Sequence, residues 1–504
     1  MVEESALEQE LFAVGEKLAA ALPRSSRNPL KAADEKAMEL ASKDAELKAA
    51  LFRFVDVVPA CRSLDDLARH LTGFLGEVGE PAPPISAAMR MGSSRAGRTA
   101  LGAAAARGVK HMAHRFIVGE TPRDALGVFR DLWKHGVASS VDLLGEATVT
   151  QAEAQRYAER CDDALTTLVE AMRGWPAQER LETDSFGSLP RANLSVKVSA
   201  LTPLLKPDAP LRGQRDAAQR LRGLLRRAHE LGAHLHIDME SMDSRDAVLE
   251  LILSLLAEEE FRAGPSAGVV LQAYLRDSPG TLDTIVEWIG AAGAQRAQPL
   301  TVRLVKGAYW DHEIVEAVQH GWQPPVFEVK ADSDLNFELL TRGLIDHRAE
   351  GCGLRPAIAS HNLRSVAHAI AYNRLAGGKD ADVEMQILRG LGDPLQTAIA
   401  AQGLRVRAYC PVGDLVAGMA YLVRRLLENT SNDSFLNDQA RGVGLERACK
   451  LRTDRRAPQL EDRLGGDLLH AGAGGASSCS GGTPLAWSFR NESLLVFSSS
   501  RRTR

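Results

Sequence analysis

The feature that most limits the fold of this chain is a series of eight short β-rich runs, each followed by a helical stretch. Such runs are typical of parallel strands, and the helical stretches between them are typical of crossover connections. The runs cover residues 140–144, 194–200, 234–239, 269–274, 301–305, 357–360, 383–388 and 406–409. Eight such units favour an α/β fold with a distorted (β/α)8, TIM-like barrel over an open sheet.

The segments before and after these eight units have different sequence patterns. Residues 1–110 are rich in Ala, Leu, Glu and Lys and have helical periodicity over 7–21, 32–54 and 64–75. Residues after about 440 lose the strand–helix pattern and are rich in Gly and Ser from 471 to 482. We therefore predict a helical arm over 1–110, a catalytic barrel over 111–440 and a disordered tail over 441–504.

The composition excludes several classes of protein. The 504 residues include 61 basic and 65 acidic side chains, a net charge of −4, which gives no electrostatic footprint for nucleic acid. The six cysteines are too far apart in sequence for a CxxC pair or a zinc knuckle. The acidic start does not resemble a secretory signal, and the apolar stretches are too short to span a bilayer. We expect a cytoplasmic protein whose only membrane contact is peripheral.

Polar residues follow nearly every predicted strand. In a barrel of this kind the reactive groups gather at the carboxyl ends of the strands. One buried polar residue per strand is costly without a shared ligand or hydrogen-bond network. The residues at these ends are Glu146, Lys197, Asp238, Gln272, Arg303, Lys306, Ser360, His361, Asn362 and Tyr409. The alternative is a solvated barrel rim, because rims are polar in any case.

The third predicted strand offers a possible metal site. Side chains at alternate positions of a strand share one face, and four potential ligands alternate here: His234, His236, Asp238 and Glu240. A barrel hydrolase would use such ligands to acidify a zinc-bound water. However, Lys197 and Arg303 on neighbouring strands would compete with a cation for the cavity. We therefore expect no metal, and a hydrogen-bonding role for the two histidines.

Two consecutive arginines, Arg424 and Arg425, lie on a predicted helix that Asp414 would cap. Planar guanidinium groups bind carboxylates bidentately, which suits an acidic substrate. On a conventionally packed outer helix Arg424 would point away from the apolar stripe and be solvated beside Glu428. Only a helix shifted across the barrel mouth would make the pair a carboxylate clamp.

Nucleotide-binding motifs are mostly missing. The Gly-Leu-Gly sequence at 390–392 starts like a dinucleotide fingerprint but lacks the third glycine, and no Walker motif is present. A Rossmann-type nicotinamide enzyme is therefore not expected. A flavin bound in a barrel needs no such fingerprint.

Several strings together point to one family. They include Asn-Leu-Ser-Val-Lys-Val-Ser at 193–199, His-Ile-Asp-Met-Glu at 236–240, Val-Val-Leu-Gln-Ala-Tyr at 269–274, Arg-Leu-Val-Lys-Gly-Ala-Tyr-Trp at 303–310, Ser-His-Asn at 360–362 and Tyr-Leu-Val-Arg-Arg-Leu-Leu-Glu-Asn at 421–429. By the order of these motifs the chain resembles the proline dehydrogenase domain of the proline utilization A family from about residue 30 to 435. The resemblance implies non-covalently bound FAD, oxidation of L-proline to Δ1-pyrroline-5-carboxylate, and transfer of the electrons to a membrane quinone.

The resemblance also implies roles for individual residues. Lys197, Arg424 and Arg425 should hold the proline carboxylate, with the arginines on a helix over the mouth. Tyr409 should lie against the proline ring and Leu388 should form an apolar wall. Asp238 should orient the cationic cluster, and Glu146 should gate the entrance by pairing with an arginine of the clamp.

The remaining matched positions are expected to contact the cofactor. Arg303 should lie near flavin N5, where a fixed positive charge favours the reduced flavin. The other expected contacts are Met239, Gln272, Lys306, Gly307, Ala308, Trp310, Ser360, His361 and Asn362.

The chain departs from bifunctional family members after residues 429–434, where no aldehyde dehydrogenase domain follows. We therefore expect it to stop at pyrroline-5-carboxylate, which a separate pyrroline-5-carboxylate dehydrogenase would take. The acidic N-terminal region also lacks the DNA-binding segment of some members, so no repressor role is expected. Two rival functions remain, a metal-dependent barrel hydrolase and a catalytically silent amino-acid-binding protein.

Overall fold

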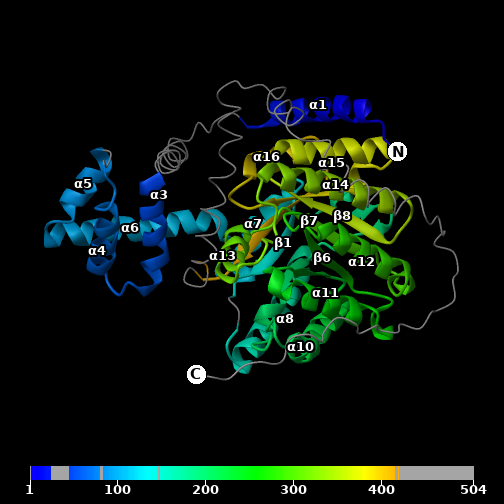
Figure 1. Cartoon of the computed structure of the whole chain (residues 1–504), viewed down its shortest axis with the longest axis horizontal. Helices are drawn as coiled ribbons and strands as arrows, with labels where there is room; N and C mark the ends of the chain where they lie inside the picture. Colours follow the sequence, from blue (N-terminus) through cyan, green and yellow to red (C-terminus); the bar gives the residue numbers. More distant parts are fainter. Residues whose placement is uncertain (1, 24–44, 80–82, 146–147, 415–417, 419–504) are drawn as a thin grey trace, which may run out of the picture.

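Eight parallel strands close into a barrel at the centre of the computed structural model, which describes residues 2–23, 45–79, 83–145, 148–414 and 418 (Figure 1). Around the barrel the strands follow the order β1-β10-β9-β8-β7-β6-β5-β4. Their bounds are β1 Ala138–Leu143, β4 Asn193–Lys197, β5 His234–Asp238, β6 Ser266–Gln272, β7 Leu300–Val305, β8 Leu354–Ala359, β9 Glu384–Leu388 and β10 Val406–Val412. The predicted barrel is confirmed.

Helices connect successive strands and surround the barrel. They are α8 Gln151–Arg173, α10 Pro210–Leu231, α11 Met242–Leu256, α12 Ser278–Gly290, α13 Trp310–His320, α14 Lys330–Ala349, α15 Leu363–Leu375 and α16 Asp393–Ala401. Short 3-10 helices η3 Glu259–Phe261, η4 Gly293–Gln295 and η5 Asp380–Asp382 lie in the connections. The helix predicted after β10 lies outside the described residues. Among those that are described, no helix is long and apolar enough to cross a membrane.

The second predicted strand, residues 194–200, is too long. Strand β4 ends at Lys197, and η2 (Val198–Ala200) follows as a 3-10 turn, with the Leu201 amide donating to the Val198 carbonyl at 2.9 Å. The side chain of Ser199 in this turn hydrogen-bonds Glu240, which follows β5. The apolar sequence continues through the turn because Val198 and Ala200 are buried, so composition alone could not mark the end of the strand.

The barrel interior is polar rather than filled by the branched aliphatic layers usual in this fold. On β5, His234, His236 and Asp238 alternate with Leu235 and Ile237, and all five side chains are buried. The aliphatic residues belong to the main hydrophobic core, which packs the strands against the helices. The polar residues form hydrogen-bonded layers from the amino end of the barrel to its carboxyl end.

The N-terminal helices take two positions. Helix α1 (Glu4–Ala21) lies along α15, and Leu7, Leu11 and Leu18 join the hydrophobic core of the barrel (Figure 1). Helices α3 (Ala45–Val57), α4 (Leu64–Leu75), α5 (Pro83–Met91) and α6 (Arg95–Phe116) project to one side, with η1 (Val58–Ala60) between α3 and α4. Helix α7 (Pro122–Lys134) leads from them into β1.

The arm formed by α3 to α6 meets the barrel close to its carboxyl end. Phe116 and Ile117 at the end of α6 share a hydrophobic cluster with Leu144, which follows β1. Arg115 donates from Nε to the carbonyl of Gly390, which follows β9, at 3.0 Å. The arm therefore lies beside the end of the barrel at which polar residues were expected to gather.

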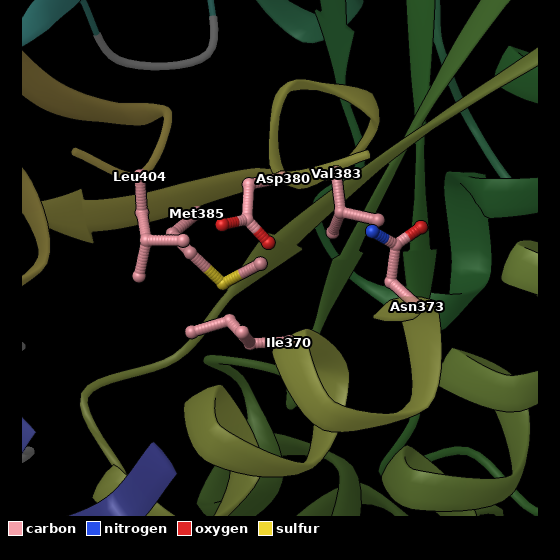
Figure 2. A pocket seen from close by; sticks show the side chains of 6 residues that line it. All are labelled: Ile370, Asn373, Asp380, Val383, Met385 and Leu404. Atoms are coloured by element: carbon pink, nitrogen blue, oxygen red, sulfur yellow. The ribbon is translucent and has the colours of Figure 1, made fainter. Parts of the chain in front are cut away.

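A small hairpin lies at the opposite, amino end of the barrel. It consists of α9 (Glu179–Glu182), β2 (Thr183–Asp184) and β3 (Gly187–Ser188), and the sequence did not predict it. Asp184 receives two hydrogen bonds from Arg355 of β8, at 2.8 and 3.2 Å. A hollow of about 10 Å³ between α15 and β9 lies near this end and is lined largely by apolar side chains (Figure 2).

Candidate active site

Arg303 is the centre of the polar cluster at the carboxyl end of the barrel. It lies on β7 with 3% of its surface exposed, and it donates from Nη1 to Asp238 at 2.7 Å and from Nε to Gln386 at 2.7 Å. Its Nη2 reaches the hydroxyls of Ser195 at 3.2 Å and Ser140 at 3.4 Å. Four strands thus fix one guanidinium group in place inside the barrel.

Asp238 at the end of β5 links this arginine to two other predicted residues. The Tyr409 hydroxyl donates to Asp238 Oδ2 at 2.7 Å, and Lys197 Nζ lies 3.6 Å from the same oxygen. The Tyr409 ring also lies under the Arg303 guanidinium, whose Cζ is 5.2 Å from the ring centroid. The structure therefore brings together Lys197, Asp238, Arg303 and Tyr409, although their sequence positions span more than 200 residues.

Asp142 completes the cluster, and the sequence analysis missed it. It lies on β1, only 2% exposed, and forms an ion pair with Lys197. We had assigned the carboxylate of this strand to Glu146, which lies outside the described residues. The available signal was the alternation of Ser140 and Asp142 in an otherwise apolar run, which places both on the inner face of β1.

These charges set the protonation states within the cluster. Burial alone would lower the pKa of Lys197, but the Asp142 and Asp238 carboxylates outweigh burial and raise it above its ordinary value. Burial, together with the same two carboxylates, raises the pKa of Tyr409 well above that of an exposed phenol. At neutral pH the cluster therefore presents an ammonium group and a protonated phenol.

The cofactor residues predicted on β5 and β6 lie beside this cluster. Met239 is buried directly after Asp238, and Gln272 at the end of β6 donates from Nε2 to the Glu240 carbonyl at 2.8 Å. The oxygen of the same amide, Gln272 Oε1, is buried and has no hydrogen-bond donor among the described residues. A buried acceptor without a donor suits a ligand that carries an N–H group, as an isoalloxazine does.

The predicted loop after β7 is shaped around Gly307. Its φ of +128° is a backbone conformation that other residues rarely adopt, and a Cβ atom there would lie 2.3 Å from the Tyr274 ring. Lys306 before it forms an ion pair with Asp334 of α14. Ala308 is exposed, and Trp310, 40% exposed, donates from Nε1 to the Phe327 carbonyl at 2.9 Å. The loop is thus anchored by the ion pair of Lys306 with α14 and by the hydrogen bond of Trp310 to the Phe327 carbonyl.

The predicted Ser-His-Asn sequence follows β8. Ser360 Oγ accepts from the Asn362 amide at 3.1 Å, and Asn362 caps α15 by accepting from the Ser365 amide at 3.1 Å. His361 Nε2 accepts from the amide of Leu388 at 2.9 Å, which ties the ends of β8 and β9 together. Leu388 itself is half-buried at the end of β9.

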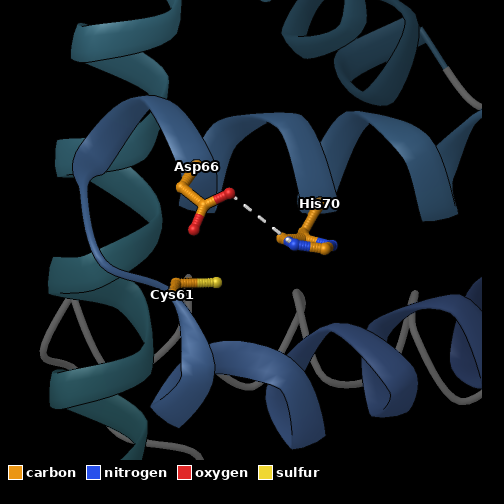
Figure 3. Close-up of side chains that lie close together, drawn as sticks. All are labelled: Cys61, Asp66 and His70. Atoms are coloured by element: carbon orange, nitrogen blue, oxygen red, sulfur yellow. Dashed lines mark ion pairs between the residues drawn. The ribbon is translucent and has the colours of Figure 1, made fainter.

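The rings of His234 and His236 lie next to each other inside the barrel, with centroids 5.5 Å apart. His234 is hydrogen-bonded through Nδ1 to Ser266 Oγ at 2.8 Å and through Nε2 to His236 Nδ1 at 3.2 Å. Among the described residues, two groups bring three potential metal ligands together, and both lie away from the mouth. One is Cys61, Asp66 and His70 on the arm, where the His70 and Asp66 side chains are 3.8 Å apart (Figure 3). The other is His347, Glu350 and Cys352.

Several predicted site residues cannot be placed. Glu146, Arg424 and Arg425 lie outside the described residues, as do the whole of the predicted tail and most of the predicted last helix. The gate and the carboxylate clamp therefore stay predictions, as do the roles assigned to the residues above.

Two family models match this chain. The family model for proline dehydrogenase matches residues 125–438, and the model for the proline utilization A N-terminal domain matches residues 8–116. The bifunctional protein PutA of Salmonella typhimurium is 32% identical over 381 residues, which cover 74% of this chain and 26% of that protein. The proline dehydrogenase of Deinococcus radiodurans is 29% identical over 327 residues, or 65% of this chain and 89% of that one.

A similar fold is known from crystals of proline utilization A from Bdellovibrio bacteriovorus inactivated by N-propargylglycine. That structure has a TM-score of 0.76 and 34% identity, covering 91% of this chain and 44% of that one. The chain spans about a quarter of the length of the curated PutA protein of Salmonella typhimurium. The family model for proline dehydrogenase nevertheless covers more than half of this chain, from before β1 to beyond β10. The chain belongs to the proline dehydrogenase family.

Proposed function

We propose that this protein oxidises L-proline to Δ1-pyrroline-5-carboxylate with non-covalently bound FAD, and that a membrane quinone accepts the electrons. The observation that carries the proposal is the cluster of Lys197, Asp238, Arg303 and Tyr409 at the carboxyl end of the barrel, in which Asp238 and Arg303 are buried and the other two are half-buried. Family membership supplies the expected reaction, and the cluster supplies side chains that would orient the substrate.

When bound, FAD would supply an oxidised isoalloxazine able to accept a hydride from the carbon next to the ring nitrogen of proline. Gln272, whose buried Oε1 has no donor among the described residues, and the Gly307 loop are the residues that fit this cofactor best. Met239, Lys306, Ala308, Trp310, Ser360, His361 and Asn362 complete the proposed cofactor set. Arg303 would hold a fixed positive charge beside the site where negative charge builds up on reduction.

The described cluster contains no net positive charge to attract a carboxylate. Lys197 and Arg303 are balanced by Asp142 and Asp238, which are already paired with them. Binding of the proline carboxylate therefore requires further cations, and Arg424 and Arg425 would provide them. Without a clamp of this kind, placing an anionic group here would leave it poorly compensated.

Within this arrangement the remaining residues orient the substrate. Tyr409 is held by its hydrogen bond to Asp238 and by stacking on Arg303, so its ring offers a fixed flat surface to the proline ring. Leu388 would form the apolar wall. Glu146 would gate the entrance by pairing with an arginine of the clamp.

The product and the electrons require partners. A separate pyrroline-5-carboxylate dehydrogenase would take the product, and a cytoplasmic protein in peripheral contact with the membrane would reach the quinone. No nucleic acid is proposed as a partner.

The test is product formation by the purified, FAD-loaded protein. L-Proline and a soluble quinone should yield pyrroline-5-carboxylate, measured by mass spectrometry, at a rate that D-proline does not match. Arg303→Met should abolish most of this activity, whereas Arg226→Met, on the exposed face of α10, should not. Quinone reduction that does not depend on proline would contradict the proposal.

A further inference from the structure

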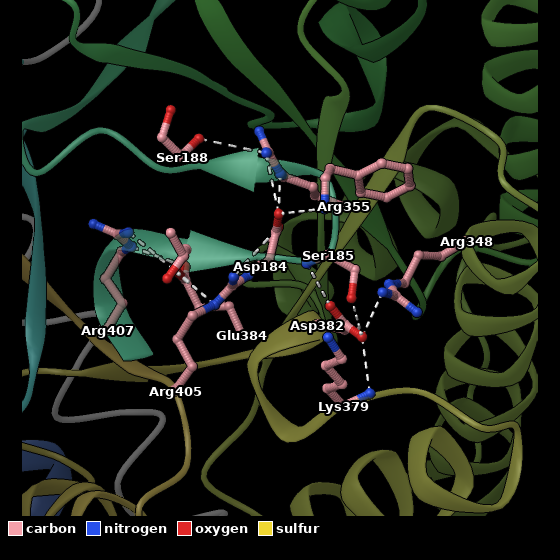
Figure 4. A network of polar contacts seen from close by, with 12 residues as sticks. Asp184, Ser185, Ser188, Arg348, Arg355, Lys379, Asp382, Glu384, Arg405 and Arg407 are labelled. Atoms are coloured by element: carbon pink, nitrogen blue, oxygen red, sulfur yellow. Dashed lines mark hydrogen bonds and ion pairs between the residues drawn. The ribbon is translucent and has the colours of Figure 1, made fainter. Parts of the chain in front are cut away.

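Five charged side chains are buried together at the amino end of the barrel, next to a separate ion pair between Arg348 and Asp382 (Figure 4). Arg355 lies on β8, Glu384 on β9 and Arg407 on β10, while Arg405 directly precedes β10 and Asp184 belongs to the hairpin. The three arginine residues are 2–4% exposed, and the two acidic side chains are 1% and 7% exposed. None of these residues takes part in the proposed oxidation.

Each of the two carboxylates already has its own arginine. Arg355 donates to both oxygens of Asp184, at 2.8 and 3.2 Å. Arg407 donates to both oxygens of Glu384, at 2.8 and 3.0 Å, and also to the Ser139 carbonyl at 2.8 Å. Such bidentate pairs are compact and geometrically satisfied.

Arg405 is left between these two pairs. Its Nη1 donates a long hydrogen bond of 3.5 Å to Asp184 Oδ2, and its Nε lies 3.6 Å from Glu384 Oε2. Its buried Nε makes no hydrogen bond to any described residue. Within this group of five, three guanidinium groups thus face two carboxylates, while the neighbouring Asp382 is already paired with Arg348 at 2.5 Å.

No neighbouring histidine alters this balance. His234 lines the same region, and burial, assisted by Arg407, lowers its pKa to about 3, so the ring is neutral at ordinary pH. An uncompensated buried charge is costly, and proteins usually pair such a charge or bind a counter-ion.

A hollow adjoins the arginines. Its volume of about 20 Å³ exceeds the roughly 10–15 Å³ that a single water needs. Its walls include the three arginines and Glu384, which is paired with Arg407, together with Asn193, Thr301 and Gln386. Arg355 Nη1 is buried and has no partner within the described part of the chain. Two unused donors, Arg355 Nη1 and Arg405 Nε, therefore belong to arginines that border one small hollow.

We propose that this hollow binds one small monovalent anion of the size of chloride, held by Arg355, Arg405 and Arg407. The unused groups are all donors, so an occupant must be an acceptor. Water would satisfy the donors but leave the excess charge, whereas a monovalent anion satisfies both. Gluconate is much larger than chloride and is therefore the reference anion of the test.

The test compares thermal unfolding of the FAD-loaded protein in sodium gluconate and sodium chloride at equal ionic strength. Chloride should raise the unfolding midpoint of the wild type in a saturable way, by roughly 1–3 °C. Arg405→Gln removes the excess charge, so its midpoint should be equal in the two salts and no lower in gluconate than that of the wild type. Arg226→Gln, which removes an exposed arginine paired with Glu260, should keep the chloride effect.

Crystals grown with bromide provide a direct readout that needs no variant. An anomalous peak between Arg355 and Arg405 supports the anion. Equal midpoints of the wild type in both salts, together with no bromide peak, would mean that water alone fills the hollow, and the proposal would be wrong. An equal chloride effect in wild type and Arg405→Gln would also overturn it, because the effect would then arise elsewhere.

Discussion

Replacing Arg303 with methionine is the sharpest test of how the mouth cluster is held together. The change removes a guanidinium group that hydrogen-bonds four side chains and leaves Asp238, whose side chain is 11% exposed, without its strongest partner. Methionine has a similar length and no charge, so it should fill most of the space. The main loss is therefore electrostatic rather than steric.

The magnitude follows from what Asp238 retains. Removing one partner of a buried ion pair typically costs about 3–5 kcal/mol. Lys197 at 3.6 Å and the Tyr409 hydroxyl at 2.7 Å still face the carboxylate. We therefore expect the lower end, about 3 kcal/mol. For a chain of this size, that loss should lower the thermal midpoint by roughly 3–5 °C.

The assay is thermal unfolding of four proteins with the FAD content of each measured: wild type, Arg303→Met, Asp238→Asn and the double variant. Asp238→Asn removes the stranded charge, so the double variant should be less destabilised than the sum of the two single changes, by about 1 kcal/mol or more. Additive single effects, or a midpoint unchanged in Arg303→Met, would refute a coupled buried pair.

Three further outcomes are expected. Gly307→Ala should weaken FAD binding and lower the thermal midpoint, because the φ of +128° and the Tyr274 ring both exclude a Cβ atom. The control Gly223→Ala on α10 places its Cβ near no other atom and should have little effect. Equal retention of flavin in both variants would count against a role of the Gly307 loop in binding FAD. The free energy of unfolding should fall as the pH drops from 6.5 toward 3, because His234 binds a proton at about pH 6.5 in the unfolded chain but only near pH 3 in the folded one. Thermal melts at pH 7.5 and pH 5 measure this loss, and His234→Asn should reduce the difference between the two midpoints. Arg424→Met and Arg425→Met should each raise the Michaelis constant for proline by at least about tenfold, since a charge-assisted contact to the carboxylate is lost; unchanged constants in both variants would exclude the clamp.

The barrel could be predicted because local sequence carries its signal. Each predicted run is a short β-rich segment before a predicted helix, and the eight runs overlap the eight strands. Strand ends were less certain, as the turn after Lys197 illustrates, since burial continues where the strand stops. The mouth residues could be found because a barrel brings the carboxyl ends of all its strands together.

Other features had no local signal. Asp142 was passed over because Glu146 lies in the more usual place just after the strand, whereas Asp142 faces inward from within it. The cluster at the amino end depends on Asp184, which is 171 residues from Arg355 and 221 from Arg405. No spacing rule links such positions, and only the closed barrel brings the hairpin under β8 and β10.

We propose that the cluster of Lys197, Asp238, Arg303 and Tyr409 at the barrel mouth presents proline to FAD, and the visible absorbance spectrum of the flavin tests this most directly. We predict that the purified protein is yellow and that its visible absorbance is bleached when L-proline is added without oxygen. A flavin that binds but stays oxidised would instead favour a silent amino-acid-binding protein. Colourless protein with stoichiometric zinc would favour the hydrolase, and either result would contradict the claim.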